Sequence, residues 1–126
     1  MEDLPDSDAL LVAVARYLRE VAAPALDGQA GFHARVAANA IEIVRRQRKL
    51  GPVAEAAEQA RLERLLGESG DLADLNARLC ERIAAGDLDE TSASLVEHLW
   101  LTTLDKLAVD QPGYASFRQA TGQDPR

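Results

Sequence analysis

The segment from Ser92 to Val109, SASLVEHLWLTTLDKLAV, decides the fold class of this chain of 126 residues. At about 100° per residue, its apolar side chains cover most of the circumference of a helix. A helix that is apolar nearly all round is buried on several sides. The segment therefore predicts either the central helix of a bundle or part of a subunit interface.

The composition of the whole chain also favours helices. Alanine and leucine supply 41 residues, whereas valine, isoleucine and threonine together supply 15, which leaves little material for a sheet. Hydrophobic residues make up 47% and charged residues 28%, as in an ordinary globular protein. We therefore expect an all-α, single-domain bundle of five to six helices over residues 1–126, with residues 1–6 and 120–126 flexible.

Glycine and proline residues divide the chain into six helical segments. We expect helices over residues 7–23, 31–50, 52–67, 72–86 and 92–109, and a short helix after Pro112. Apolar stripes predict the packing faces of the first two segments. These stripes are Leu11, Val14, Leu18 and Val21 in the first segment, and Phe32, Val36, Ala40, Ile43 and Leu50 in the second.

Charge is distributed unevenly along the chain. The net charge of −7 divides into −4 for residues 1–27, +4 for 28–50, −3 for 51–86 and −4 for 87–126. Four basic residues end the segment 31–50, where cations interact favourably with the helix dipole: Arg45, Arg46, Arg48 and Lys49. We expect Arg61 and Arg64 on a solvated face beside glutamates. Because the rest of the chain is acidic and only 4% of its residues are aromatic, no nucleic-acid partner is expected.

Other features argue against several classes of protein. No run of 18 or more apolar residues predicts a membrane span, and the acidic N-terminus does not resemble a signal peptide. The single cysteine, Cys80, cannot form an internal disulfide, so we expect a reducing cytoplasm and a thiol packed beside the apolar stripe of segment 72–86. His33 and His98 lack metal-ligand spacing, and no phosphate loop or nucleophile motif is present. We therefore expect no metal, no cofactor and no catalytic residue.

One polar cluster is predicted from the edges of two helices. Arg35 and Asn39 border the apolar stripe of segment 31–50, and Lys106 and Asp110 in the later segment are spaced for an ion pair. If these edges face each other, Arg35 meets Asp105 or Asp110, because buried charges must be paired. The cluster is then either a structural network or a pocket for a ligand or partner. Its candidate residues are His33, Arg35, Asn39, Asp105, Lys106 and Asp110.

Three stretches carry a resemblance to a known family: FHARVAANA at 32–40, GDLADLN at 70–76 and LDKLAVDQPGY at 104–114. They resemble a bacterial family known only as a domain of unknown function, and the resemblance extends from about Leu10 to Phe117. Members of this family tend to be encoded beside aminoglycoside-phosphotransferase-like kinases and acyl-CoA dehydrogenases. The resemblance implies an accessory protein, since this chain lacks the catalytic motifs of such a kinase.

Two functions follow from these observations. The first is a non-catalytic accessory or interaction protein, which we expect to form a homodimer and to bind a metabolic enzyme. The second is a binding protein or minor enzyme for an anionic, acyl-CoA-like molecule, which would use Arg35, Asn39, Lys106 and Asp110. The sequence favours the first, because the apolar segment 92–109 occurs in a chain without a catalytic motif.

Overall fold

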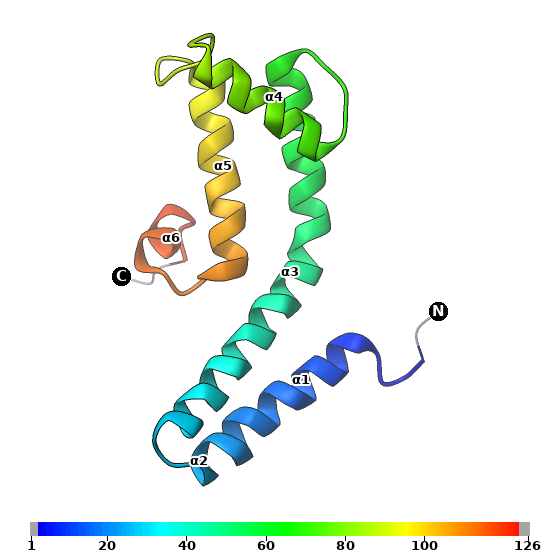
Figure 1. Ribbon diagram of the computed structural model, residues 1–126, viewed down its shortest axis with the longest axis vertical. Helices are drawn as coiled ribbons and strands as arrows, with labels where there is room; N and C mark the ends of the chain where they lie inside the picture. Colours follow the sequence, from blue (N-terminus) through cyan, green and yellow to red (C-terminus); the bar gives the residue numbers. More distant parts are fainter. Residues whose placement is uncertain (1–2, 124–126) are drawn as a thin grey trace. The chain divides into compact units, whose positions relative to one another are not determined.

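The computed structural model describes residues 3–123, and every regular element in that range is helical (Figure 1). The elements are α1 (Ser7–Tyr17), the π-helical turn η1 (Leu18–Ala22), α2 (Ala23–Ala25), α3 (Gly28–Leu66), α4 (Leu72–Ala84), α5 (Ala93–Asp110) and α6 (Ala115–Ala120). Because α1, η1 and α2 are continuous, they form one helix, and residues 3–123 contain five. The prediction of an all-α bundle of five to six helices is confirmed.

Contacts within the chain group into two compact units, which meet in sequence inside α3. Unit 1 ends at Lys49, and unit 2 begins at Leu50. The single domain over residues 1–126 and the flexible ends at 1–6 and 120–126 stay predictions. Residues 1–2 and 124–126 lie outside the described residues.

The first helix begins at a side-chain cap and contains one wide turn. The carboxylate of Asp6 accepts a hydrogen bond of 2.8 Å from the backbone N–H of Ala9, as expected for an N-cap. Further along, the N–H of Ala23 donates to the carbonyl of Leu18, five residues back, which is the π-helical pattern. Pro24 lacks a backbone N–H, but it lies in the first turn of the short α2 that follows, where proline does not break a helix. The helix therefore continues to Ala25 instead of ending at residue 23.

The turn between α2 and α3 depends on two glycines. Gly28 has a φ of +60°, a left-handed conformation that side chains rarely adopt. A Cβ on Gly31 would lie 2.5 Å from the carbonyl oxygen of Leu26, so no other residue fits there without a shift of the backbone. These two positions allow α3 to return alongside α1.

The predicted break between segments 31–50 and 52–67 is wrong, because α3 is one helix of 39 residues with Pro52 inside it. The fixed φ of proline is compatible with a helix, and its cost is one lost backbone hydrogen bond and a local clash. The residues on both sides, rich in alanine, arginine, glutamate and leucine, favour the helix strongly enough to continue it.

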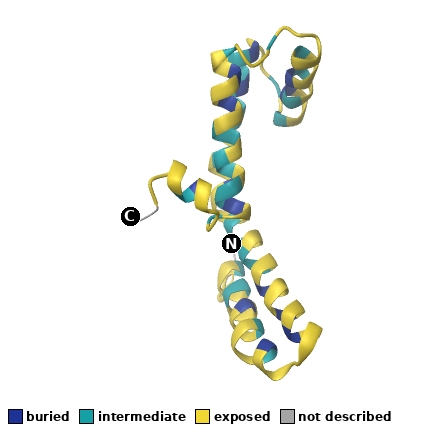
Figure 2. Ribbon diagram, turned by 90° about the vertical axis from the view of Figure 1, so that its left-hand side faces the viewer, coloured by how far each residue is buried: buried dark blue, intermediate teal, exposed yellow. Residues whose placement is uncertain are grey.

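The core of unit 1 is a seam of alanines. Ala15 and Ala23 on the first helix and Ala34 and Ala38 on α3 are buried, with Ala38 fully so. Figure 2 shows unit 1 with buried residues along its paired helices and exposed residues over much of the outer surface.

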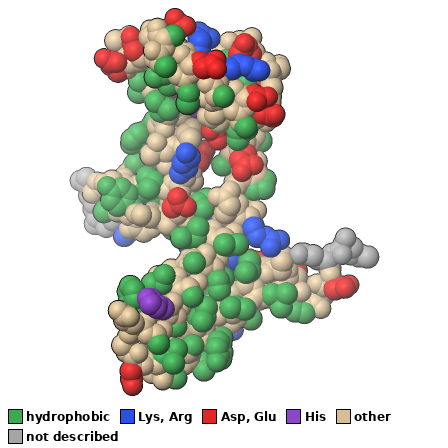
Figure 3. Space-filling view, in the orientation of Figure 1, with side chains coloured by type: hydrophobic (Ala, Val, Ile, Leu, Met, Phe, Trp, Pro, Cys, Tyr) green, Lys and Arg blue, Asp and Glu red, His purple; other side chains and the backbone are tan. Residues whose placement is uncertain are grey.

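The larger apolar residues of unit 1 do not form the packing face that their spacing predicts. Val14, Val21, Phe32, Val36 and Ile43 are all exposed. Ala40 and Leu50 are exposed as well, whereas Leu11 and Leu18 are half-buried. Figure 3 shows hydrophobic side chains gathered over the helices of unit 1. Alanine lets two helices approach closely, so the alanine faces meet and the larger stripes remain largely outside.

Unit 2 has a leucine core between α3, α4 and α5. Leu62, Leu66, Leu75, Leu79 and Leu95 are buried there against one another. The carboxylate that caps α4 accepts a hydrogen bond of 2.8 Å from the N–H at the third helical position, as its sequence spacing predicts.

One expectation for unit 2 is corrected, and of the two alternatives for the apolar segment 92–109 the central helix does not fit. Cys80 is exposed, so the packing expected for its thiol is wrong. Helix α5 is apolar nearly all round, but Val96, Leu99 and Trp100 are exposed, and the described residues therefore do not enclose it. One side of α5 contributes Leu95 to the leucine core, and Val96, Leu99 and Trp100 are open to solvent.

Candidate functional site

The most buried polar group of the described residues is His98, and it belongs to a cluster between α3 and α5 in unit 2. Arg61 Nε donates to His98 Nδ1 over 3.4 Å, and Arg61 Nη2 donates to Thr102 Oγ1 over 3.2 Å. The same guanidinium lies 3.7 Å from an Asp105 carboxylate oxygen. His98, Thr102 and Asp105 follow one another at intervals of four and three residues, so they lie on the same face of α5. All three contact the guanidinium of Arg61.

The electrostatics of this cluster keep His98 neutral. Burial lowers the pKa of His98 below its ordinary value of 6.5, and the charge of Arg61 lowers it further. Glu58 acts in the opposite direction but does not reverse the shift. A neutral imidazole is also what the hydrogen bond requires, because Nδ1 must be unprotonated to accept from Arg61.

A pocket of about 290 Å³ lies beside this cluster. It is lined by Arg61, Arg64, Leu65, Ser94, Glu97, His98 and Leu101. Two arginines and a serine hydroxyl are groups that bind a small carboxylate or phosphate, although Glu97 opposes an anion. The pocket can therefore hold a small polar molecule.

The polar residues of unit 1 pair across α1 and α3. Arg45 makes two hydrogen bonds to the Asp8 carboxylate, of 2.8 and 3.1 Å, and one of 2.9 Å to Glu42. The bond from Arg45 is the main reason that the pKa of Asp8 is below its ordinary value. Arg19 donates to Asn39 Oδ1 over 2.9 Å and lies 3.7 Å from Glu42. These contacts hold the two helices in one register.

The basic residues that end segment 31–50 surround a second pocket, of about 460 Å³. Asp8 and Glu42 line the same pocket, and Arg48 donates to the Ser7 hydroxyl over 2.6 Å. The carboxylates neutralise part of the positive charge, and Arg45 is already bound to both of them. These contacts suit a network that joins two helices better than a strong anion site.

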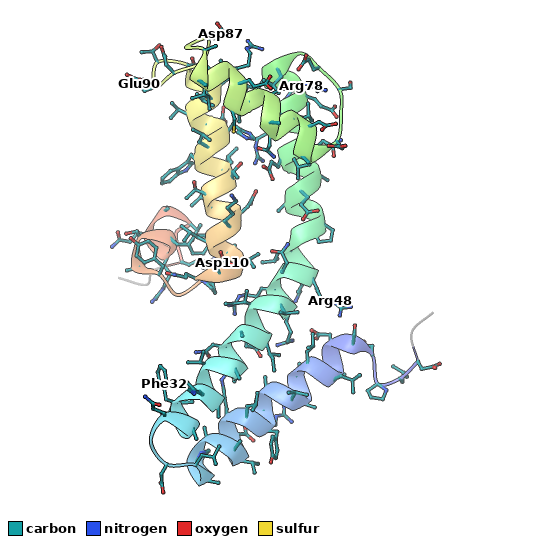
Figure 4. All side chains as sticks on the ribbon, in the orientation of Figure 1. Phe32, Arg48, Arg78, Asp87, Glu90 and Asp110 are labelled. Carbon is teal, nitrogen blue, oxygen red and sulfur yellow. The ribbon has the colours of Figure 1, made fainter. Side chains whose placement is uncertain are left out.

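The third hollow is an apolar groove of about 610 Å³ at the junction of α4, the loop after it and α5. Its walls are formed by Ile83, Gly86, Leu88, Asp89, Glu90, Leu95, Val96, Leu99, Trp100 and Thr103. Figure 4 shows that Asp87 and Glu90 lie in the loop that joins α4 to α5. The groove therefore combines apolar walls with acidic residues at one end.

The six residues predicted as a polar cluster are divided between the two units. His33, Arg35 and Asn39 belong to unit 1, and Asp105, Lys106 and Asp110 belong to unit 2. All of them are exposed except Asp105, which is half-buried.

Two of the six have polar partners that the structure identifies, namely Arg19 for Asn39 and Arg61 for Asp105. The contact predicted between Arg35 and Asp105 or Asp110 stays a prediction, because it would join the two units. His33 lies against Phe32, with the ring centres 5.8 Å apart.

The sequence analysis missed Arg61 and His98 as members of a buried polar cluster. Arg61 was expected on a solvated face, yet its side chain is only 14% exposed. The signal that points to it is the polar series His98, Thr102 and Asp105, which recurs at helical spacing within the apolar segment. Such a series needs a buried partner, and a cation satisfies both a neutral imidazole and a carboxylate.

Residues 3–123 contain no group of three or more His, Cys, Asp or Glu side chains placed to hold a metal ion. Within the same range, no helix combines the length and the apolar character that a membrane span requires.

The comparison with known proteins gives one family. The profile described as "Domain of unknown function (DUF6285)" matches residues 24–114, which is more than two-thirds of the chain. No curated protein and no solved structure matches significantly. The matched region includes α3, α4, α5 and the Arg61–His98 cluster. The chain therefore belongs to the DUF6285 family, a domain of unknown function.

Proposed function

We propose that this protein is a non-catalytic interaction protein that forms a homodimer through the outer faces of its unit 1 helices and serves as an accessory to a metabolic enzyme. The observation that carries the proposal is the inverted packing of unit 1. Its seam is built from alanines, and its large apolar residues are about half exposed, with Tyr17 at 58% and Phe32 at 56%. Exposed apolar residues in this number are typical of an interaction surface.

The spacing of these residues indicates a helical partner. On the first helix, Leu10, Val14, Tyr17 and Val21 recur at intervals of four, three and four residues. On α3, Phe32, Val36 and Ile43 follow the same heptad pattern, with Asn39 at the remaining position. Helices with this mean period of about 3.5 residues pack in left-handed bundles. Two copies of unit 1 can associate by packing one of these stripes against the same stripe of the second copy.

Asn39 gains a role in this arrangement. A polar residue at one heptad position fixes the register of a bundle at some cost in stability. Asn39 Oδ1 already accepts a hydrogen bond from Arg19, which orients the amide. In the proposed dimer, Asn39 would therefore determine the register of the two copies, as well as joining the helices of one copy.

Charge supports a second copy as the occupant of this face. Residues 1–49 contain equal numbers of acidic and basic side chains, whereas residues 50–126 carry the whole net charge of −7. Two neutral unit 1 surfaces approach without net repulsion. A two-fold axis would present each copy with the same stripes that it exposes itself, which is the usual arrangement of a homodimer.

The apolar energy is of the size that a weak, reversible dimer needs. Full burial of a large apolar side chain contributes about 1.5–3 kcal/mol, so each half-exposed residue offers about 1 kcal/mol. One stripe offers three or four such residues per copy, or about 6–8 kcal/mol for the pair, against a cost of association of about 4–15 kcal/mol. We therefore expect an equilibrium between monomer and dimer that depends on concentration.

Sedimentation velocity over a wide range of protein concentration tests the dimer. The double variant Val14→Ser, Val36→Ser removes apolar surface from both stripes, and we expect it to raise the dimer dissociation constant at least tenfold. Val53→Ser is the matched control, because Val53 is 75% exposed but lies in unit 2. A wild-type protein that stays monomeric at the highest concentration would contradict the proposal, as would equal effects of the two changes.

The accessory role rests on the resemblance to a bacterial family whose genes lie beside acyl-CoA dehydrogenases and phosphotransferase-like enzymes. Purification of the tagged protein from its native host, followed by mass spectrometry, tests this role. We expect an enzyme of one of these two classes to co-purify. Recovery of this chain alone would remove the support for an enzyme partner, while leaving the dimer to be judged by sedimentation.

A second candidate function, the binding of a small anion, is favoured by the pocket beside His98. Arg61, Arg64 and Ser94 converge on it from two helices. It differs from the pocket predicted from the sequence, which needed residues of both units. Thermal-shift measurements with acetate, inorganic phosphate and acetyl-CoA test it at constant ionic strength. A ligand at 100 times its Kd should stabilise the fold by about 2.7 kcal/mol, and Arg64→Gln should reduce the effect.

A further inference from the structure

We propose that the apolar groove between α4 and α5 binds an amphipathic helix of a partner protein, one whose apolar residues are flanked by lysine or arginine. The inference rests on the proposed function, because it identifies the kind of partner that an interaction protein of this type would take. It concerns unit 2 alone, and the surface is separate from the unit 1 stripes.

The groove has the size and lining of a site for a helix. Its volume is about 610 Å³, and its walls include Ile83, Leu88, Leu99 and Trp100. Along α5 it extends from Leu95 to Thr103, which corresponds to about 12 Å of helix axis and so to about two turns of a partner helix. An amphipathic helix binds such a groove through anchors spaced by three and four residues.

The apolar walls of the groove are open to solvent. Trp100 is 56% exposed, Val96 49%, Leu99 45% and Ile83 40%. Exposed aromatic and aliphatic side chains in one hollow are the usual anchors of a protein interface. In Figure 3, hydrophobic side chains are also visible along α5. The side of α5 that borders the leucine core at Leu95 and carries Val96, Leu99 and Trp100 therefore has the character of a binding surface.

The acidic end of the groove selects the charge of the partner. Asp89 and Glu90 line the groove, and Asp87 lies in the same loop, where it pairs with Arg82 over 3.6 Å. The hydroxyl and the backbone N–H of Thr91 both donate to Asp89, which lowers the pKa of that carboxyl. Because unit 2 also carries the whole net charge of the chain, basic helices are attracted to it and acidic ones are repelled.

The same charge argues against a second copy of this surface as the occupant. Face-to-face pairing of two grooves would bring two acidic loops together, each on a unit with a charge of −7. Like charges at close range disfavour such a pair. A basic helix satisfies the apolar walls and the acidic loop at once.

The chain contains its own reporter for the test, because Trp100 is its single tryptophan. The probe is a 14-residue peptide of leucine and lysine with the leucines on one helical face. We expect its titration to shift the emission of Trp100 to shorter wavelength, as the indole leaves water. A peptide of the same pattern with glutamate in place of lysine should bind at least tenfold more weakly.

Matched variants locate the binding. Val96→Ser, in the groove, should weaken the lysine peptide at least fivefold, whereas Val53→Ser, exposed on α3 of the same unit, should leave its affinity unchanged. Glu90→Gln should weaken it at low salt and have less effect at high salt. Both valines are exposed, so we expect the variants to keep the fold, and circular dichroism checks this.

Several results would overturn the proposal. These are emission that does not change with the lysine peptide, equal affinity for the two peptides, or equal loss in the two valine variants. Emission that changes on dilution of the protein alone, with no response to peptide, would assign the groove to a second copy. The unit 1 double variant distinguishes this proposal from the dimer, because it should lose the dimer and still bind the peptide.

Discussion

Replacing Arg61 by methionine tests whether the cluster around His98 contributes to stability. Methionine keeps most of the apolar stem of arginine and removes the guanidinium. The change removes two hydrogen bonds, to His98 and Thr102, and the ion pair with Asp105. It leaves the neutral imidazole without its donor, in a position where the residue is only 3% exposed.

The distances set the expected loss. Hydrogen bonds of charged groups contribute about 1.5–3 kcal/mol at good geometry. The two bonds of Arg61 span 3.4 and 3.2 Å, which is long for N–H donors, so we assign about 1 kcal/mol to each. The ion pair, at 3.7 Å and with the Asp105 side chain 42% exposed, adds a few tenths of a kcal/mol at most. The free energy of unfolding should therefore fall by about 2 kcal/mol.

Urea unfolding, followed by the fluorescence of Trp100, measures this loss. Trp100 lies on the same helix as His98, so it reports on unit 2. Arg64→Met is the control, since Arg64 is exposed one turn further along α3 and should cost less than about 0.5 kcal/mol. A stable Arg61→Met variant, or an equal loss in both variants, would refute the reasoning that the buried guanidinium holds the two helices together.

Three further predictions concern single groups. The folded-state pKa of His98 lies below 6.5, so as the pH falls the imidazole takes up a proton first in the unfolded chain. The free energy of unfolding should therefore decrease as the pH falls from about 7.5 to about 5.5, and His98→Gln should flatten this dependence in urea titrations. Leu75→Ala opens a cavity at a fully buried position and should cost about 2–5 kcal/mol in urea unfolding, more than any change at an exposed leucine. Thr91→Val removes the hydroxyl that bonds Asp89, so the pKa of that carboxyl should move up toward 3.8 in an NMR titration; an unchanged value would show that the backbone N–H alone holds it.

The helices and their caps could be predicted because their signals are local. Asp6 and Asp71 each directly precede a helix and cap it, and aspartate is among the residues preferred at that position. The continuity of α3 could not be predicted, because Gly51–Pro52 usually ends a helix and here does not. The outcome depends on a balance between one lost hydrogen bond and the helix propensity of the flanking residues, and the motif itself does not give that balance.

The packing of unit 1 could not be predicted from periodicity. The pattern identifies the stripe with the most apolar carbon, which on α3 is Phe32, Val36 and Ile43. The stripe that meets the other helix is instead formed by Ala34 and Ala38. Periodicity finds an apolar face, but it does not show whether the same chain or another one covers that face.

The predicted polar cluster stays a prediction, because it would join the two units. Asp105 does pair with an arginine, but that arginine belongs to the same unit and comes from the second half of α3. Arg61 was instead expected on a solvated face beside glutamates, because helix periodicity alone does not show which polar residues another helix covers.

The alanine seam of unit 1 has a consequence for how its two helices are held along their length. Methyl groups present a nearly smooth surface, with few steps that interlock, so sliding of one helix past the other meets little steric resistance. The contacts Arg45–Asp8 and Arg19–Asn39 lie at two separate points along the first helix, and each opposes sliding of the helices. The alignment of the two helices in this hairpin therefore depends on its surface polar residues. Concentrated salt should weaken this alignment before the helices unfold.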